Sequence, residues 1–237
     1  MIIIDKKKIL MFILGLFCFS TLLFANMHQV EKTALTSSTP VTDRVIVLDA
    51  GHGKPDEGAQ SANGTTEEKT NLDITLKVQK LLEESGATVI LTRSDENGIY
   101  NLDKTTLREM KVSDIQNRVK IGNKSSADIL VSIHLNKGDN TTYSGWQTFY
   151  RKDDENGKRL ATDIQNSLAE TIKVENKRSA HDITGIYLVE HTEIPTTIVE
   201  CGFISNPQEE QKLLTNEYQN ELAWGIYLGI SNYFNEK

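Results

Sequence analysis

The stretch Val-Ile-Val-Leu-Asp-Ala-Gly-His-Gly at residues 45–53 constrains the fold of this chain more than any other. Four consecutive apolar residues, three of them β-branched, are typical of a strand that is buried on both faces. The two glycines around His52 allow the backbone to turn sharply directly after this strand. In open α/β sheets, ligands bind beyond the carboxyl ends of the strands. We therefore expect His52 to be the first ligand of a catalytic metal.

Strands and helices alternate along the rest of the chain. Apolar residues recur on one side of residues 67–84, which predicts a helix that Gly86 closes. The other predicted elements are strands at 87–92, 129–133, 145–150, 186–189 and 196–201, helices at 113–124, 156–172 and 218–234, and a short helix opened by Pro207. This order predicts an α/β fold with a mostly parallel, twisted sheet that helices cover on both faces, in a single catalytic domain.

The chain of 237 residues divides into three predicted parts: a signal or anchor segment at 1–25, a polar tether at 26–43 and the catalytic domain at 44–237. A formal net charge of −7 argues against nucleic acid as a partner, because phosphate binding needs clustered Lys and Arg. Of the two cysteines, Cys18 lies in the N-terminal segment and Cys201 lies in the predicted domain. We therefore do not expect them to pair, and we predict no disulfide framework.

The N-terminal segment has the pattern of an export signal. Lysines at 6–8 precede an apolar run at 9–25, which as a helix would span about 25 Å, the short end of what crosses a bilayer. Ala25 is small, but Leu23 occupies the place where a cleavage site prefers a second small residue. We therefore favour an uncleaved membrane anchor over a cleaved signal.

A second buried strand, predicted at 129–133, also runs into a histidine, His134. Parallel neighbouring strands would bring His52 and His134 to the same edge of the sheet. Two imidazoles and one carboxylate are a common set of ligands for a catalytic zinc ion, with a fourth position left for water. The carboxylate would come from Glu67 or Glu68, at the start of the helix that follows the first strand.

Glu200 ends the last predicted strand and is the expected general base for a metal-activated water. Side chains alternate along a strand, so Glu200 and Cys201 point to opposite faces and only one of them can serve the site. Cys201 acting as a nucleophile with His134 is the alternative, but it would leave Glu200 and His52 without a role.

We expect three other polar residues to have roles outside catalysis. We expect Arg93 to anchor a loop, and His181 and His191 to be surface residues in loops. The polar stretch at 93–112 is longer than most loops in a compact domain, which suggests a binding or lid role.

Five separated motifs occur in one order along the chain. They are Asp-Ala-Gly-His-Gly at 49–53, Gly-Thr-Thr-Glu at 64–67 leading to Asn71 and Leu72, Thr-Arg at 92–93, Ser-Ile-His-Leu-Asn at 132–136, and Val-Glu-Cys-Gly-Phe-Ile-Ser-Asn at 199–206. In this combination the chain resembles the zinc-dependent N-acetylmuramoyl-L-alanine amidases over residues 44–235.

The resemblance implies hydrolysis, with Zn²⁺ as cofactor, of the peptidoglycan amide that joins the lactyl group of N-acetylmuramic acid to L-alanine. It implies that Glu67 is the third metal ligand and that Glu200 is the catalytic glutamate. The family usually has lysine after the ligand glutamate, where this chain has Glu68. Two other functions are compatible with the residues: a zinc peptidase acting on stem peptides, and a peptidoglycan-binding domain without catalysis.

The chain is further similar to the short amidases that act on the spore cortex. The resemblance rests on Gly-Trp-Gln-Thr-Phe-Tyr at 145–150, on the N-terminal anchor and on the lack of cell-wall-binding repeats. It implies a role in muramic-δ-lactam formation and germination, an extracytoplasmic location at the cell wall or between the forespore membranes, and an activating lipoprotein or other protein partner in some relatives.

Overall fold

The computed structural model describes residues 15–17, 19–21 and 38–235. Contacts divide the chain into one unit at Met1–Ser38 and a second at Thr39–Lys237. Most of the predicted anchor at 1–25 and tether at 26–43 lies outside the described residues. Residues 15–17 and 19–21 are helical. Within the described ranges, none of the helices combines the length and apolar character needed to cross a membrane.

Residues 39–43, which the sequence assigned to the tether, pack on the folded unit. Val41 is fully buried in the main hydrophobic core. The Thr39 hydroxyl donates a hydrogen bond of 2.7 Å to the carbonyl of Ser85, at the end of the first long helix. Packing therefore begins at Thr39, a few residues before the predicted domain boundary at 44.

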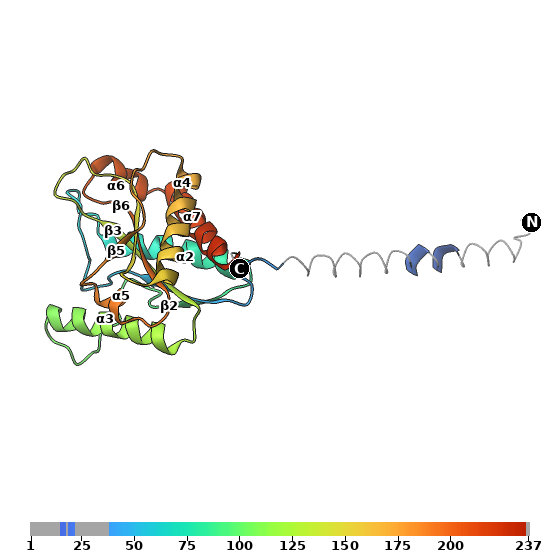
Figure 1. Ribbon diagram of the computed structural model, residues 1–237, viewed down its shortest axis with the longest axis horizontal. Helices are drawn as coiled ribbons and strands as arrows, with labels where there is room; N and C mark the ends of the chain where they lie inside the picture. The colour runs from blue at the N-terminus through green and yellow to red at the C-terminus, as the bar shows by residue number, and fades with distance from the viewer. Residues whose placement is uncertain (1–14, 18, 22–37, 236–237) are drawn as a thin grey trace, which may run out of the picture. The chain divides into compact units, whose positions relative to one another are not determined.

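A six-stranded sheet forms the centre of the unit (Figure 1). Its strands follow the order β2-β1-β3-β6-β4-β5. The strands are β1 (Val45–Ala50), β2 (Thr88–Leu91), β3 (Ile129–Asn136), β4 (Gln147–Arg151), β5 (His181–Ile183) and β6 (Thr196–Phe203). The first four strands in the sheet order run parallel, and β4 is antiparallel to β6. The predicted α/β fold with a mostly parallel sheet is therefore confirmed.

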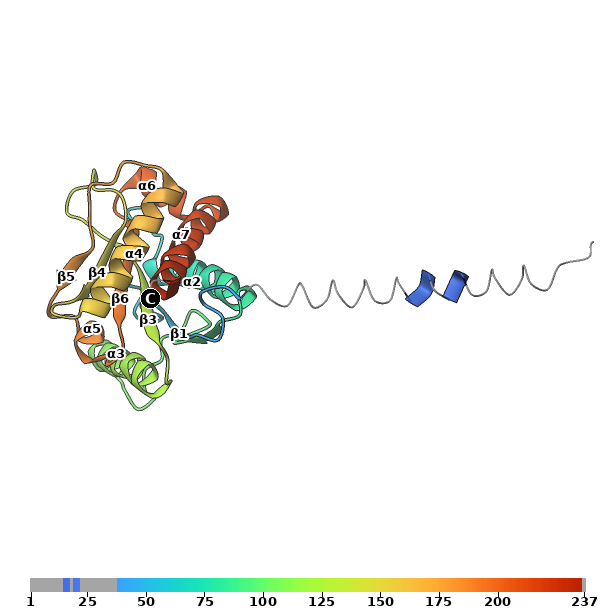
Figure 2. The same ribbon diagram turned by 45° about the vertical axis from the view of Figure 1, so that its right-hand side comes forward.

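Helices cover both faces of this sheet (Figure 2). The larger core contains residues of α2 (Glu67–Glu84), α4 (Glu155–Ile172) and α7 (Asn216–Asn235) packed on one face. The smaller core contains residues of α3 (Leu107–Lys124) and α5 (Tyr187–His191) packed on the other. A short helix, α6 (Pro207–Leu213), follows β6, and Pro207 opens it as predicted.

Strand β1 lies between β2 and β3 and is buried on both faces, as its sequence predicted. Ile46 and Leu48 belong to the larger core, whereas Val47 belongs to the smaller one. Successive side chains of a strand point to opposite faces of the sheet, and each face carries a hydrophobic core. All three side chains are therefore fully buried. The strand is thus fixed in position up to the turn that carries His52.

The helix predicted from residue 113 begins six residues earlier, at Leu107. Its start is a capping box: the Thr106 side chain accepts from the Glu109 backbone N–H, and the Glu109 carboxylate accepts from the Thr106 backbone N–H. The polar stretch predicted to be a loop over 93–112 is therefore shorter, and its last third is the first turns of α3.

Two predictions about the segment before β6 are wrong. Residues 181–183, predicted as part of a loop, form the edge strand β5, which pairs with β4. Residues 187–191 form the helix α5, where a strand was predicted at 186–189. A short apolar run fits a strand or one helical turn equally well, and tertiary packing of Leu188 and Val189 against the core decides for the helix here.

Candidate active site

The His52 turn is the most constrained piece of backbone at the site. His52 has a φ of +62°, a left-handed conformation that costs a residue with a side chain about 1–3 kcal/mol. Gly51 is required beside it, because a Cβ at this position would lie 2.2 Å from Cε1 of His134. The turn places His134 against Gly51, next to His52, and contacts from other elements must stabilise its left-handed conformation.

Two buried arginines hold this turn. Arg118 on α3 donates to the carbonyls of Ala50 and His52. Arg93, after β2, donates to the carbonyls of Ala50 at 2.9 Å and Gly51 at 3.0 Å. Arg93 thus anchors backbone, as the sequence predicted.

Arg118 is itself fixed by acidic side chains. It forms ion pairs with Asp49 at 2.6 Å and with Asp114 at 2.5 Å. Burial alone would raise the pKa of Asp49, but the charge of Arg118 and hydrogen bonds from Ser132 and Thr92 outweigh it and lower this pKa to about 2. Asp49 is therefore ionised and supports the turn through Arg118.

The predicted residues His52, Glu67 and His134 form one cluster. Their ligand atoms all lie within 4.8 Å of one another. Nε2 of His52 is 3.4 Å from one Glu67 carboxylate oxygen, and Nδ1 of His134 is 3.0 Å from the other. The two rings meet edge to face at 5.0 Å. Two imidazoles around one buried carboxylate are a donor set that fits a divalent metal ion.

Glu67 and not Glu68 lies between the imidazoles. Backbone N–H groups of Ala59 and Leu135 and the side-chain amide of Asn71 donate to the Glu67 carboxylate. Burial raises the pKa of Glu67, but hydrogen bonds from the two imidazoles outweigh it and leave this pKa well below its usual range. Glu68 is buried outside the cluster, and its Oε2 has no hydrogen-bond partner among the described residues.

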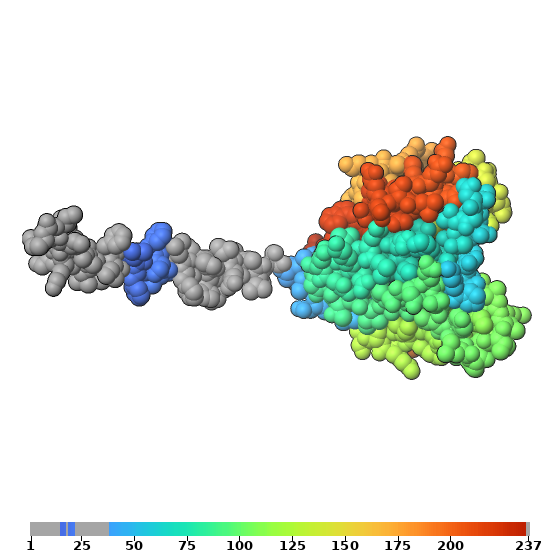
Figure 3. Space-filling view, turned by 180° about the vertical axis from the view of Figure 1, so that it is seen from behind, coloured from blue at the N-terminus to red at the C-terminus, as the bar shows by residue number. Residues whose placement is uncertain are grey.

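The loop that leads from the His52 turn to Glu67 is fastened to α6. The carboxylate of Glu210 accepts hydrogen bonds from Ser61 at 2.6 Å, Thr65 at 2.7 Å and Asn63 at 2.8 Å. Figure 3 shows the loop as the blue-to-cyan strip at the edge of the domain, between the orange-red α6 and the green α3. These hydrogen bonds fix the end of the loop that leads into α2, so Glu67 is held in one position.

Asp56 and Lys111 are parts of the site that the sequence reasoning missed. Asp56 accepts a hydrogen bond of 2.9 Å from Nδ1 of His52, which leaves Nε2 facing Glu67. Lys111 on α3 pairs with the other Asp56 oxygen at 2.9 Å. Burial would lower the pKa of His52, but Asp56 and Glu67 outweigh it and raise this pKa to about 9. Residues 52–56 form no helix, so their four-residue spacing carries no sequence signal for this contact.

Glu200 lies beside the cluster, because it pairs with His134 in the register of β3 and β6. Its Oε2 is buried and has no hydrogen-bond partner among the described residues. Burial, together with the charge of Glu67, raises the pKa of Glu200 to about 7, although the imidazoles oppose this shift. A carboxyl group that titrates near neutral pH is suited to accept and release a proton.

Cys201 points to the opposite face, where it is fully buried in the larger core. Burial raises the pKa of its thiol far above the usual range. This position excludes the alternative in which Cys201 attacks as a nucleophile with His134.

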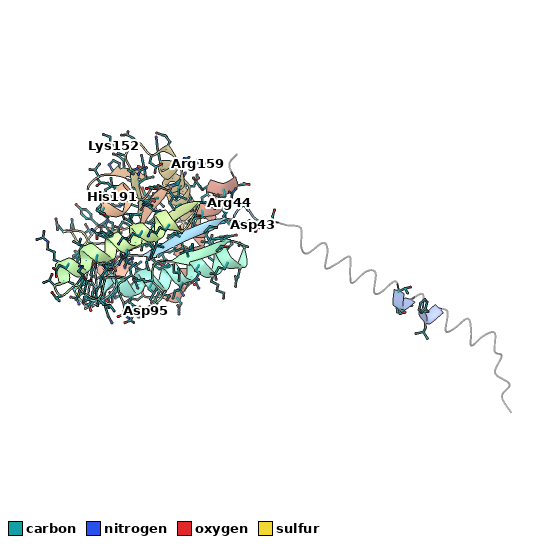
Figure 4. All side chains as sticks on the ribbon, turned by 90° about the horizontal axis from the view of Figure 1, so that it is seen from below. Asp43, Arg44, Asp95, Lys152, Arg159 and His191 are labelled. Atoms are coloured by element: carbon teal, nitrogen blue, oxygen red, sulfur yellow. The ribbon has the colours of Figure 1, made fainter. Side chains whose placement is uncertain are left out.

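Two further histidines of the described residues, His181 and His191, lie outside the cluster. His181 is exposed on β5, and His191 stacks on the ring of Tyr187 at 3.9 Å. Figure 4 shows His191 on the opposite side of the domain from Asp95. The carbonyl of Asp95 accepts a hydrogen bond from Arg93, which also binds the turn beside His52.

Comparison with known proteins identifies the family. Residues 46–232 match the Amidase_3 family, described as N-acetylmuramoyl-L-alanine amidase. The chain belongs to this family. It is 36% identical to the germination-specific N-acetylmuramoyl-L-alanine amidase of Bacillus subtilis, over 98% of this chain and 97% of the relative.

Two solved structures share the fold. The CwlD amidase of Clostridioides difficile, solved in complex with the GerS lipoprotein, is 40% identical, covers 82% of this chain and 100% of its own, and superposes with a TM-score of 0.80. The catalytic domain of the amidase CwlV from Bacillus (Paenibacillus) polymyxa is 30% identical, covers 82% of this chain and 99% of its own, and superposes with a TM-score of 0.69.

The substitution Asp56→Asn tests the contact to His52. We expect zinc affinity to fall about 10- to 100-fold, because a carboxylate behind a ligating histidine fixes its orientation and raises its basicity. The affinity is measured by competition with a chromophoric chelator. Asp73→Asn, which removes a charge paired with Lys69 on the surface of α2, is the matched control and should bind zinc like the wild type. Equal affinities for both variants would contradict this role of Asp56.

The substitution Glu200→Gln tests the burial of this carboxyl group. Its pKa of about 7 in the folded state lies above the ordinary value of 4.5, so the folded state holds the proton more tightly and loses stability as the pH rises from 4.5 to 7. Glutamine cannot ionise, and its free energy of unfolding relative to wild type should therefore rise by about 2 kcal/mol between pH 5 and pH 8.

The measurement is urea unfolding of the metal-free proteins at both pH values, with chelator present. Glu84→Gln, at the exposed end of α2, is the control and should show no such change. A difference for Glu200→Gln that does not depend on pH would show that the group is not held in its neutral form.

Proposed function

We propose that this protein is a zinc-dependent peptidoglycan hydrolase that cleaves the amide between N-acetylmuramic acid and the L-alanine of the stem peptide. Membership of the amidase family supports the reaction. The observation that carries the proposal is the placement of Glu200 beside the His52–Glu67–His134 cluster, because metal-assisted amide hydrolysis needs a metal site and an adjacent base.

The donor set of the cluster suits zinc, with His52, Glu67 and His134 as the ligands. A zinc ion held there would polarise the scissile carbonyl and make an attacking water more acidic. Glu200 accepts the proton of that water as its oxygen adds to the carbonyl carbon. Glu200 then returns the proton to the nitrogen as the carbon–nitrogen bond breaks, and the alanine leaves with a free amino group.

The surrounding residues keep this geometry in place. Asp56 holds His52 by Nδ1, and the amide of Asn71 with the N–H groups of Ala59 and Leu135 holds the Glu67 carboxylate. Such supporting contacts reduce the rearrangement that the site must undergo during the reaction.

Digestion of purified peptidoglycan by the zinc-loaded protein tests the reaction. We expect the wild type to release intact stem peptides with a free L-alanine amine. Glu200→Gln should keep a stoichiometric zinc ion, measured by plasma mass spectrometry, and lose about 100- to 10,000-fold in turnover, because it cannot carry the proton.

The same digest distinguishes the other two functions. Fragments cut within the stem peptide would identify a zinc peptidase. A wild-type protein that binds peptidoglycan without releasing fragments would identify a binding domain. Full hydrolysis by Glu200→Gln would remove Glu200 from the reaction.

The proposed setting is the spore cortex, outside the cytoplasm, with a lipoprotein or other protein partner. The names of two of the three similar amidases support it: one is germination-specific, and one was solved with a lipoprotein. In this setting the N-terminal segment at 1–25 is an uncleaved membrane anchor.

Cell fractionation tests the anchor and the partner together. The full-length chain should remain in membranes after an alkaline wash, whereas a chain that begins at Thr39 should be soluble. Specific activity in the membrane fraction should exceed that of the purified domain if a partner is required. Recovery of a shortened, soluble chain would show that the N-terminal segment is a cleaved signal instead.

A further inference from the structure

An apolar pocket of about 350 Å³ opens directly beside Glu200 and His134. Six apolar side chains form most of its wall: Ile115, Phe149, Ile183, Ile186, Leu188 and Ile198. Asn136 completes the lining. Volumes of this order are typical of pockets that hold small ligands.

Strand alternation explains why the apolar wall and the proposed base face the same space. Ile198 and Glu200 are two residues apart on β6 and therefore point to the same side of the sheet. Phe149 pairs with Ile198 in the neighbouring strand β4. Across the pocket, β5 and α5 supply Ile183 and Leu188. The two elements that sequence patterns misassigned thus build one wall of the pocket.

A second hollow lies next to this pocket. It is lined by His52, Asp56, Lys111 and Arg118, among others, and shares His134 and Ile115 with the apolar pocket. Glu200 lines the apolar pocket but does not line this second hollow.

The chemistry of hydrolysis decides which part of the substrate enters each hollow. Glu200 delivers the proton to the leaving nitrogen, so this nitrogen must lie at its carboxylate. The side chain of the amino acid that carries the nitrogen is only two bonds away from it. The acyl and sugar part extends from the carbonyl carbon in the other direction, towards the second hollow.

We propose that the apolar pocket is the subsite for the side chain of the first stem-peptide residue, and that it accepts aliphatic side chains larger than the methyl group of alanine. This inference rests on the proposed function. A methyl group fills only a small part of about 350 Å³. The subsite thus excludes charged side chains, because burying a charge without a partner is costly, but sets a loose upper limit on apolar size.

Synthetic N-acetylmuramoyl dipeptides that differ only in the first residue test the subsite. With alanine as reference, we expect kcat/KM to fall about fourfold for glycine and to be maintained or raised for valine and leucine, by up to about fourfold for each added methylene that is buried, since each contributes about 0.8 kcal/mol. Aspartate in this position should be at least about a hundredfold poorer.

Two variants of Ile183 change the wall without touching Glu200 or the cluster. Ile183→Asn should lower kcat/KM for the valine and leucine substrates relative to alanine by about tenfold, because it places an amide against their side chains. Ile183→Trp fills the pocket and should retain the alanine substrate while rejecting leucine. Leu102→Asn is the matched control, since Leu102 is 95% exposed and lies outside the pocket.

The outcomes separate this inference from the reaction itself. Cleavage of the alanine substrate with rejection of valine and leucine, or with ratios that neither Ile183 variant alters, would overturn the subsite and leave the amidase function intact. A zinc-loaded protein that cleaves none of the substrates, alanine included, would overturn both. Ratios that shift only in the Ile183 variants, and not in Leu102→Asn, would support the subsite.

Discussion

The ion pair between Arg118 and Asp49, buried to 2% and 1% exposure, is the interaction on which the site depends. It fixes a guanidinium group under the turn after β1, where that group binds the carbonyls of Ala50 and His52. Removing one partner would leave an uncompensated buried charge, which typically costs about 3–5 kcal/mol. The pair therefore stabilises a left-handed histidine that the backbone would otherwise not adopt.

The site places carboxyl groups where burial destabilises their ionised form. Glu67 is 3% exposed and is ionised because two imidazoles and two backbone N–H groups surround it. Among the described residues, none donates a hydrogen bond to Oε2 of Glu200, and the same burial raises the pKa of Glu200. Two carboxylates on neighbouring elements thus acquire opposite proton affinities from their surroundings, which is the usual basis for dividing binding and proton transfer between two acids.

Sequence patterns predicted the central elements well because their signals are local and strong. The helix over residues 67–84 and the buried strand at 45–50 agree with the structure, since each carries a long, consistent apolar pattern. The start of α3 was missed because its signal is the Thr106–Glu109 capping box in a polar stretch. The segment 181–191 was misassigned because pairing with β4 and packing on the smaller core decide its conformation.

The sequence by itself determined strands β1, β2, β3 and β6, the edge where two histidines meet and the face on which Glu200 lies, because strand periodicity and chain order dictate these features. Tertiary structure placed Glu67, and not Glu68, between the two imidazoles, placed Asp56 behind His52 and joined Arg118 to the turn. These contacts connect residues whose spacing along the chain carries no periodic signal, and buried charges find their partners only when the helices are packed on the sheet. The apolar pocket has the same origin, since its walls come from four strands and two helices that meet only in the folded chain.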